Sequence, residues 1–406
     1  MPTVVQISIE VNSGSVGRIA EQIGEILIEN GWKSYITYAR NNLPSKSKVI
    51  KIGSSYDVYM HVLQTRLLDN HCFASKKATK RLIRDLEELE PDIIHMHHLH
   101  GYFINIEILF AYLKKKSIPV VWTFHDCWAF TGRCAYFEFI DCNKWKTECH
   151  TCPQLNEYPK TLFFDKSTKN FKLKKEIFNE VDNLTIVPVS NWLGDLVKES
   201  FLSNYPIKVI QNGIDTNVFS PLANLSDTRN KYNLENKFVI LGVASTWDAR
   251  KGLDFFVELN KVLDSDETII LVGLSKEQVK HLPDGVIGIE RTESVQDLAS
   301  LYSVADVFVN PTLEDTFPTT NLESLSCGTP VITFRTGGSV ESVSEETGLI
   351  VEKGDVSALY KAIKEIKLNT KSFYTHNCRA RALALYNKNE RFTEYLDLYK
   401  NLIDGK

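Results

Sequence analysis

The sequence predicts an α/β protein with two doubly wound parallel sheets, and three observations support this fold class. Short apolar runs alternate with segments of helical periodicity along most of the chain. This alternation occurs in two separate series, one in each half of the chain. The length of 406 residues exceeds what one compact core normally needs and fits two domains.

The first series begins with an apolar strand at residues 4–9 and a helix at 17–30, which carries Ile19, Ile23 and Leu27 on one face. Because consecutive strands are separated by helical segments, they are expected to lie parallel. The strands of this series are predicted at residues 4–9, 36–38, 92–96 and 120–124.

The second series repeats the pattern. Its strands are predicted at residues 238–244, 268–272, 307–310 and 331–334, and its helices at 253–263, 295–305 and 321–326. The final helical segment, 387–403, has no strand after it. The predicted domains are therefore residues 1–200, with a cysteine-rich insertion at 127–155, residues 201–385, and a closing helix at 386–406.

Composition excludes several classes of protein. Hydrophobic residues make up 43% and charged residues 24% of the chain, which is typical of a globular protein. The 47 basic and 51 acidic residues give a net charge of −4, which disfavours nucleic-acid binding. The first residues show no signal peptide, and no apolar run approaches the ~18 residues of a membrane span. We therefore expect a cytoplasmic protein.

Ligands of open α/β sheets bind beyond the carboxyl ends of the strands, so the turns after the strands are the candidate sites. The first such turn contains Gly14 and Ser15, whose backbone amides are suited to an anion at the start of a helix. The full dinucleotide fingerprint G-x-G-x-x-G is absent. A plain tight turn is the alternative.

Histidines follow two predicted strands of the first series. The segment 95–100 carries four of them, but strand alternation sends His95 and His97 to one face and His98 to the other. One metal ion would not gather all four, so buried or cleft-lining histidines are favoured. His125 follows the next strand and is suited to hydrogen-bond a ligand.

Four cysteines lie within nineteen residues in the insertion: Cys134, Cys142, Cys149 and Cys152. Four thiolates suit one tetrahedral Zn²⁺, and the pair at 149–152 has C-x-x-C spacing. The spacing before that pair is irregular for a zinc knuckle. Structural zinc or disulfide stapling is weighed against plain buried thiols.

Two turns of the second series carry charge. Arg250 and Lys251 precede a helix, where cations and free helix amides together suit a diphosphate; a solvated basic turn is the alternative. Asp315 and Glu323 flank a second helix start at Pro318, where carboxylates suit sugar hydroxyls and amides suit phosphate. Two carboxylates near a helix are also common on plain surfaces.

In this order, these motifs resemble the retaining family-4 glycosyltransferases. The resemblance implies the GT-B fold, in which two Rossmann-like domains face each other across a cleft and a C-terminal helix crosses back to the N-terminal domain. The stretch from His125 through the four cysteines to Gln154 resembles a subgroup that builds bacterial exopolysaccharide, capsule or lipopolysaccharide, of colanic-acid type. The motifs that carry the resemblance are VIQNGID at 209–215, Lys251-Gly252, the acid-x7-acid element at 315–323, SLSCGTPVI at 324–332 and GGSVE at 337–341.

The resemblance also implies roles for single residues. Glu323 would bind the nucleotide ribose, Asp315 would contact the hydroxyls of the donor sugar, and Lys251 would neutralise the leaving diphosphate. His125 would lie against the transferred sugar, so that His125, Asp315 and Lys251 form the predicted catalytic set. The nucleotide-sugar site is predicted to comprise Gly14, Ser15, Asn212, Arg250, Lys251, Phe317, Thr319, Thr320, Asn321 and Glu323.

This chain departs from the family at two points. Asp315 stands where Glu is common, which leaves the donor sugar open, and Arg250 lies beside Lys251 rather than a few residues before it. The Asp-x-Asp at 264–266 lies at the end of a strand away from the cleft, so no catalytic metal is expected, and zinc would be structural.

The predicted reaction moves a sugar from a UDP- or GDP-sugar to a glycan or lipid-linked acceptor with retention of configuration. Basic clusters of the N-terminal half suit anionic lipid and a peripheral contact with the inner face of the cytoplasmic membrane, although solvated helix faces are the alternative. The competing functions are a GT-B sugar-nucleotide epimerase and a zinc-stapled interaction protein without catalysis.

Overall fold

The computed structural model describes residues 1–405. The chain forms two compact units. Unit 1 comprises Met1–Gln211 and the segment from Phe392 onward, and unit 2 comprises Asn212–Arg391. The boundary between the two units, after Gln211, lies slightly later in the chain than the boundary predicted at residue 200. Within the described residues, no helix is long and apolar enough to cross a membrane.

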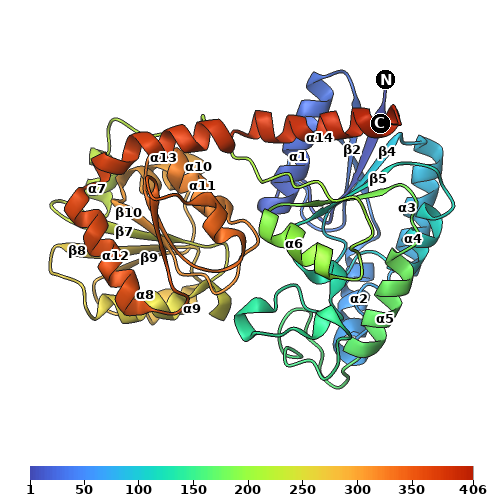
Figure 1. The fold of residues 1–406 in the computed structure, drawn as a ribbon, viewed down its shortest axis with the longest axis horizontal. Helices are drawn as coiled ribbons and strands as arrows, with labels where there is room; N and C mark the ends of the chain where they lie inside the picture. The colour runs from blue at the N-terminus through green and yellow to red at the C-terminus, as the bar shows by residue number, and fades with distance from the viewer. Residues whose placement is uncertain (406) are drawn as a thin grey trace. The chain divides into compact units, whose positions relative to one another are not determined.

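The core of unit 1 is a six-stranded sheet in the order β3-β2-β1-β4-β5-β6, and all of its strand pairs are parallel. The order reverses direction between β1 and β4, which is where open α/β sheets bind ligands. Figure 1 labels the elements of the chain. The strands are β1 (Thr3–Ile7), β2 (Lys33–Tyr38), β3 (Lys48–Lys51), β4 (Ile93–Met96), β5 (Val120–Phe124) and β6 (Leu184–Pro188).

Helices connect the strands of unit 1, as the alternation of the sequence predicted. They are α1 (Gly14–Glu29), α2 (Ser55–Leu68), α3 (Lys76–Leu89), α4 (Ile106–Leu113), α5 (Ser167–Phe178) and α6 (Asn191–Glu199). The cysteine-rich insertion contains only the short 3-10 helices η1 (Trp128–Phe130), η2 (Glu138–Ile140) and η3 (Lys144–Lys146).

The closing helix α14 (Lys388–Ile403) begins in unit 2, and from Phe392 onward it belongs to unit 1. Phe392, Leu396 and Tyr399 join the core beneath α1. The hydroxyl of Tyr399 also lies 2.6 Å from Nδ1 of the buried His95. Apolar burial and this interior hydrogen bond together hold the end of the helix on the first unit.

Unit 2 contains a second six-stranded parallel sheet, in the order β12-β11-β10-β7-β8-β9. Its strands are β7 (Phe238–Val243), β8 (Glu267–Val272), β9 (Val286–Ile289), β10 (Val307–Asn310), β11 (Val331–Phe334) and β12 (Gly348–Val351). The helices are α7 (Ser226–Lys231), α8 (Leu253–Asn260), α9 (Lys276–Lys280), α10 (Val295–Val304), α11 (Thr319–Ser326), α12 (Val356–Asn369) and α13 (Lys371–Leu385). The 3-10 helices η4 (Ala249–Lys251) and η5 (Gly337–Ser342) follow β7 and β11.

Candidate active site

The candidate site of unit 2 lies at the carboxyl ends of three neighbouring strands, β11, β10 and β7. After β7, the Asp248 carboxylate accepts a hydrogen bond from the backbone amide of Lys251 at 3.0 Å and so fixes the turn η4. Gly252 follows with φ 78°, and a Cβ at this position would lie 2.2 Å from the Pro311 carbonyl oxygen. Glycine is therefore required for the loop after β7 to approach the loop after β10.

Hydrogen bonds and one ion pair join these two loops. The amide of Leu313 donates to the carbonyl of Arg250 at 2.7 Å, and the Arg250 guanidinium donates to the carbonyl of Glu314 at 2.6 Å. The Lys251 ammonium forms an ion pair with the carboxylate of Asp315. The structure therefore brings together two pairs of residues, Arg250 with Glu314 and Lys251 with Asp315, and the members of each pair are 64 positions apart in the sequence.

The environment of Asp315 keeps this carboxyl group ionised. Burial alone would raise its pKa, but the charges of Lys251 and Arg250 outweigh burial and hold the pKa below its usual value. The backbone of the same residue is fixed by a second glycine, because a Cβ at Gly337 would lie 2.1 Å from the Asp315 carbonyl oxygen. The loop after β11 thus supports the loop after β10 at the position of the ion pair.

The helix α11 begins at Thr319, four residues after Asp315 in the sequence. Pro318 is the N-cap, the half-buried Thr319 and Thr320 form the first turn, and the first turn carries no acidic residue. The first amides of a helix have no partner within the helix, so this end suits an anion. The loop before α11 is held by Asn212, whose amide donates to the Phe317 carbonyl at 3.2 Å, while the Phe317 ring is buried. Asn212 and Phe317 therefore position the helix start.

Two further predicted residues on α11 have different surroundings. Glu323 is half-buried and accepts a hydrogen bond from the hydroxyl of Tyr302 at 2.9 Å. Asn321 is fully buried, with its side chain hydrogen-bonded to Asn310 at 2.8 Å and to Ser342 at 2.9 Å. The side chain of Asn321 is therefore committed to the interior, and the prediction that Asn321 belongs to the nucleotide-sugar site stays a prediction for its backbone amide. No sequence motif pointed to Tyr302.

In unit 1, Gly14 and Ser15 begin α1 after β1 and are exposed. Gly14 has φ 61°, which favours glycine at the turn that starts this helix. The first turn of α1 carries no acidic side chain. A Cβ at Gly14 would lie 3.1 Å from a carboxylate oxygen of Glu10, and anion binding at this helix start stays a prediction.

His125 follows β5 and is buried in a chain of hydrogen bonds. Its Nε2 lies 3.2 Å from Nδ1 of His97, and Nε2 of His97 lies 3.0 Å from Oε1 of Gln6. The amide nitrogen of Gln6 donates to the carbonyl of Ala20 at 2.8 Å. The chain of contacts therefore runs from α1 through β1 and the end of β4 to His125.

These hydrogen bonds assign the protons of the two histidines. Because the Gln6 nitrogen donates to Ala20, its oxygen accepts from Nε2–H of His97, which leaves Nδ1 of His97 as an acceptor. His125 must then donate through Nε2–H. Burial, together with the neighbouring His98 and His97, holds the pKa of His125 well below its usual value, so the ring is neutral. Its Nδ1 is therefore the nitrogen with the lone pair.

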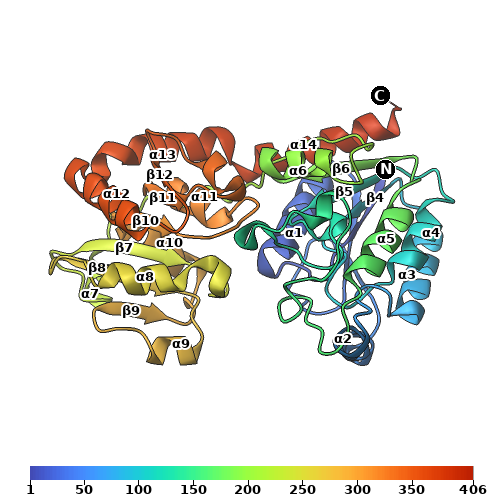
Figure 2. The ribbon, with the colours of Figure 1, turned by 60° about the horizontal axis from the view of Figure 1, so that its bottom comes forward.

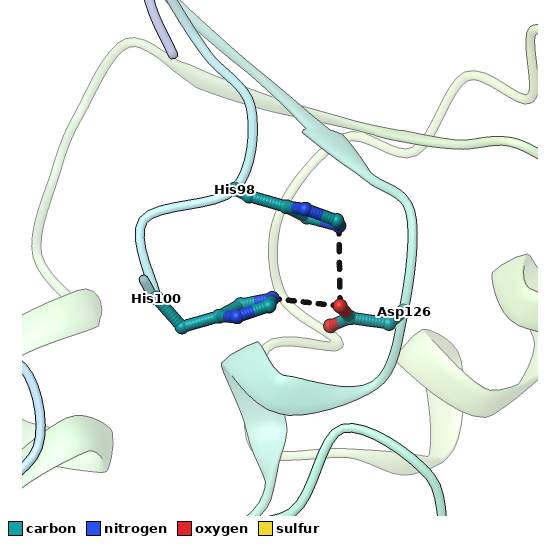
Figure 3. Close-up of side chains that lie close together, drawn as sticks. All are labelled: His98, His100 and Asp126. Atoms are coloured by element: carbon teal, nitrogen blue, oxygen red, sulfur yellow. Dashed lines mark hydrogen bonds and ion pairs between the residues drawn. The ribbon is translucent and has the colours of Figure 1, made fainter. Parts of the chain in front are cut away.

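A second histidine cluster comprises His98, His100 and Asp126 (Figure 3), and the ring centroid of His98 lies 5.2 Å from that of His125. Nε2 of His100 and Nε2 of His98 lie 2.7 Å and 3.2 Å from the same carboxylate oxygen of Asp126, and the other oxygen accepts the Trp128 amide at 2.9 Å. Burial would raise the pKa of Asp126, but the two histidines outweigh it and hold the pKa well below its usual value. His95 and His97 are buried, as the sequence favoured, whereas it did not point to Asp126 as the partner of the other two.

The four cysteines of the insertion line one small cavity of about 20 Å³, together with Arg133 and His150. Burial raises the pKa of Cys149 to about 11 and the pKa of Cys134 well above its usual value. No cysteine among residues 1–405 forms a disulfide. Four cysteine thiolates suit zinc, yet no three of their sulfurs lie within 4.8 Å of one another. The ligand atoms of His98, His100 and Asp126 do lie that close together. Zinc binding by the four cysteines stays a prediction.

The Asp-x-Asp at 264–266 precedes β8, at the opposite end of the sheet from the site. Asp264 pairs with Lys364 at 2.6 Å, and Asp266 pairs with Lys367 at 2.8 Å. Both carboxylates therefore form ion pairs with α12.

Comparison with known proteins identifies relatives of the whole chain. WcaC of Escherichia coli K12, whose name describes a glycosyl transferase of colanic acid biosynthesis, is 24% identical over 98% of this chain and 100% of its own length. A UDP-Gal:alpha-D-GlcNAc-diphosphoundecaprenol alpha-1,3-galactosyltransferase of E. coli is 25% identical over 52% of this chain and 58% of its own.

Solved structures show the same fold over the full length. Sucrose-phosphate synthase from Thermosynechococcus elongatus has a TM-score of 0.73 at 19% identity and covers 100% of both chains. HepE of Anabaena in complex with UDP-glucose has a TM-score of 0.67 at 15% identity, over 97% of this chain and 99% of its own.

Family models match both units. Residues 16–218 match the model described as Glycosyltransferase Family 4, and residues 237–369 match the model described as Glycosyl transferases group 1. The first match covers half of the chain, and the second includes Arg250, Lys251, Asp315 and Glu323. Together with two parallel six-stranded sheets, these matches establish that the chain belongs to glycosyltransferase family 4 and has the GT-B fold.

Proposed function

We propose that this glycosyltransferase moves a sugar from a UDP- or GDP-sugar to a glycan or lipid-linked acceptor, with retention of anomeric configuration, in cell-surface polysaccharide biosynthesis. The observation that carries the proposal is the meeting of Arg250, Lys251 and Asp315 beside the free helix start at Thr319. Two cations and unpartnered helix amides at one point form a site for a diphosphate.

Unit 2 holds the donor in this proposal. The ammonium of Lys251 and the amides of Thr319 and Thr320 bind the diphosphate, and Asp315 accepts hydrogen bonds from hydroxyls of the donor sugar. Glu323 accepts hydrogen bonds from the ribose, with Tyr302 holding one of its carboxylate oxygens in place. The ion pair with Asp315 orients the Lys251 ammonium before the donor arrives.

The transfer step breaks the bond between the anomeric carbon and the diphosphate oxygen. The acceptor hydroxyl attacks the same face of the sugar, and its proton passes to the departing phosphate oxygen. Charge builds up on the leaving diphosphate, and Lys251 and the start of α11 stabilise it. His125 lies against the transferred sugar. No metal ion takes part in this step.

Names of the relatives support the rest of the proposal. One relative is named for colanic acid biosynthesis and another for a diphosphoundecaprenol-linked acceptor, and these names support a polysaccharide pathway with a lipid-linked acceptor. We place the enzyme in the cytoplasm with peripheral membrane contact, and we assign any zinc on the four cysteines a structural role.

The donor site is tested by calorimetry with UDP and with GDP. One of the two nucleotides should bind, and Glu323→Ala should weaken its binding by roughly 10- to 100-fold, because a charged hydrogen-bond acceptor is lost. The exposed Glu277→Ala in the same unit is the matched control and should bind as the wild type does. Equal affinity of the Glu323→Ala and wild-type proteins would remove the ribose role.

The reaction itself is tested by nucleotide release with a panel of sugar nucleotides and acceptors, followed by NMR of the product anomer. The expected product keeps the anomeric configuration of the donor. An inverted product would refute the retaining mechanism. Absence of turnover together with absence of UDP and GDP binding would refute the enzyme proposal.

A further inference from the structure

Helix α2 buries two polar side chains and exposes several large apolar ones. His61 and Thr65 are its buried residues, whereas Tyr56 and Tyr59 are 69% and 64% exposed. A water-facing helix of a globular protein normally shows the opposite arrangement. The exposed side chains recur at helical spacing, so they share one face of the helix: Tyr56, Tyr59, Leu63 and Leu67.

A loop extends this exposed apolar surface. The amide of Leu162 donates to the Arg66 carbonyl at 2.8 Å, which ties the loop to the end of α2. Leu162, Phe163 and Phe164 are 52%, 73% and 51% exposed. We call the four side chains of α2 and residues 162–164 the apolar face. Figure 2 shows α2 at the lower end of unit 1. An exposed group of large apolar residues is a mark of an interaction surface.

A basic hollow adjoins the apolar face. It is a cavity of about 500 Å³ between α2, α3 and α5, and Met60 of α2 lines it. Among the described residues, none of its four lysines forms an ion pair, and only Asp57 and Glu107 among the lining residues are acidic. The lysines of the hollow are Lys76, Lys77, Lys166 and Lys169.

We propose that the apolar face and the basic hollow form a membrane-docking surface for an anionic bilayer. Tyrosine, leucine and phenylalanine side chains enter the boundary between headgroups and acyl chains, and the unpaired lysines bind lipid phosphates. The charge of the hollow complements a negatively charged lipid surface, whereas an apolar face alone would not select one. The protein can dock on a membrane whether or not it transfers a sugar. The purpose of docking, access to a lipid-linked acceptor, rests on the proposed function.

Vesicle flotation of the full-length protein tests the proposal. The protein should float with vesicles of phosphatidylcholine and phosphatidylglycerol, should not float with phosphatidylcholine alone, and should be released by high salt. Changing the four lysines of the hollow to Gln should weaken binding on the order of several hundred-fold, at about fivefold for each charge. The apolar variant Tyr56→Ser/Leu63→Ser/Phe163→Ser should also lose binding.

Matched variants control for charge and apolarity elsewhere. Lys-to-Gln changes at 114–116 remove a basic cluster of the same unit, and Leu368→Ser/Phe373→Ser removes exposed apolar residues of unit 2, which are 84% and 63% exposed. Both controls should bind vesicles as the wild type does. Thermal unfolding checks that every variant is folded, and calorimetry with UDP or GDP checks that the donor site is unchanged.

Three outcomes would overturn the proposal. The first is absence of wild-type binding to anionic vesicles. The second is binding that the hollow and apolar variants leave intact, since another surface would then be responsible. The third is a dimer in solution that the apolar variant dissociates without loss of vesicle binding, because a second copy would then cover the apolar face. Each outcome can occur with nucleotide binding intact, so it is distinguishable from failure of the proposed function.

Discussion

Mild acid should destabilise unit 1 far more than unit 2. Burial lowers the pKa of His61 to about 3 and holds the pKa of four other histidines of unit 1 well below the usual value. The two histidines of unit 2, His281 and His376, are exposed. The five buried histidines are His61, His71, His95, His97 and His125.

The sign follows from where the protons bind. Below about pH 6.5 an unfolded chain protonates its histidines, while the folded unit keeps these five neutral, so the free energy of unfolding falls as pH falls. At about pH 5.5 each histidine lowers the free energy of unfolding by about 1.4 kcal/mol relative to about pH 7.5. Five together give about 7 kcal/mol, which approaches the whole stability of a typical domain.

Urea unfolding measures this loss in unit 1. Of the six tryptophans, only Trp247 lies in unit 2, so the fluorescence of a Trp247→Phe variant reports unit 1 alone. Hydrogen exchange of peptides from β8 and β10, corrected for the intrinsic rate at each pH, reports unit 2. The double variant His281→Gln/His376→Gln should behave like its parent. A loss in unit 1 below about 2 kcal/mol between these pH values, or an equal loss in both units, would refute the reasoning.

Three further predictions concern single positions. Lys251→Met should reduce turnover, measured by nucleotide release, roughly 100-fold or more, because it removes the cation at the diphosphate. Lys261→Met, at an exposed position, is the control and should have no effect. Equal rates of the Lys251→Met and wild-type proteins would contradict the assigned role. Gly337→Ala should lower the free energy of unfolding by about 2 kcal/mol or more in urea titrations, because its Cβ would meet the Asp315 carbonyl oxygen. Gly354→Ala is the control: its Cβ would have open space, so it should show only the smaller cost of a positive φ. Similar losses in the two variants would exclude the steric cause. Metal analysis should find about one zinc per chain that Cys149→Ser removes, and a metal-free wild type with reactive thiols would end that prediction.

The sheets and their order along the chain could be predicted because an interior parallel strand is an uninterrupted apolar run. The strands β1, β4, β5, β7, β8, β10 and β11 were predicted in this way. The edge strands β3, β9 and β12 were missed, and they are largely half-buried or exposed. The sequence KVIK of β3 has no uninterrupted apolar run, and the runs VIGI of β9 and GLIV of β12 are only four residues long. The remaining edge strand, β6, is buried along its whole length, so its run LTIVP was an available signal.

Residues of the candidate site that lie in loops with fixed motifs could also be singled out from the sequence, and their binding roles stay predictions. Position 252 requires glycine because a Cβ there would meet the Pro311 carbonyl oxygen. Lys251 and Asp315 are opposite charges that form an ion pair. Asn321 resembled a ligand-binding residue in the same motif, yet its side chain bonds inward to Asn310 and Ser342. A motif reports which residue is needed but not which way its side chain faces.

Periodicity along the chain was sufficient for the fold class, and the resemblance of short motifs was sufficient for the family, because both depend on neighbouring residues. Hydrogen-bond partners come from distant segments, and these emerged only from the folded chain. Gln6 and His97 are 91 residues apart, yet they set the tautomer of His125. The exposed apolar face of α2 likewise became visible only when folding turned the polar side of that helix, with His61 and Thr65, toward the interior.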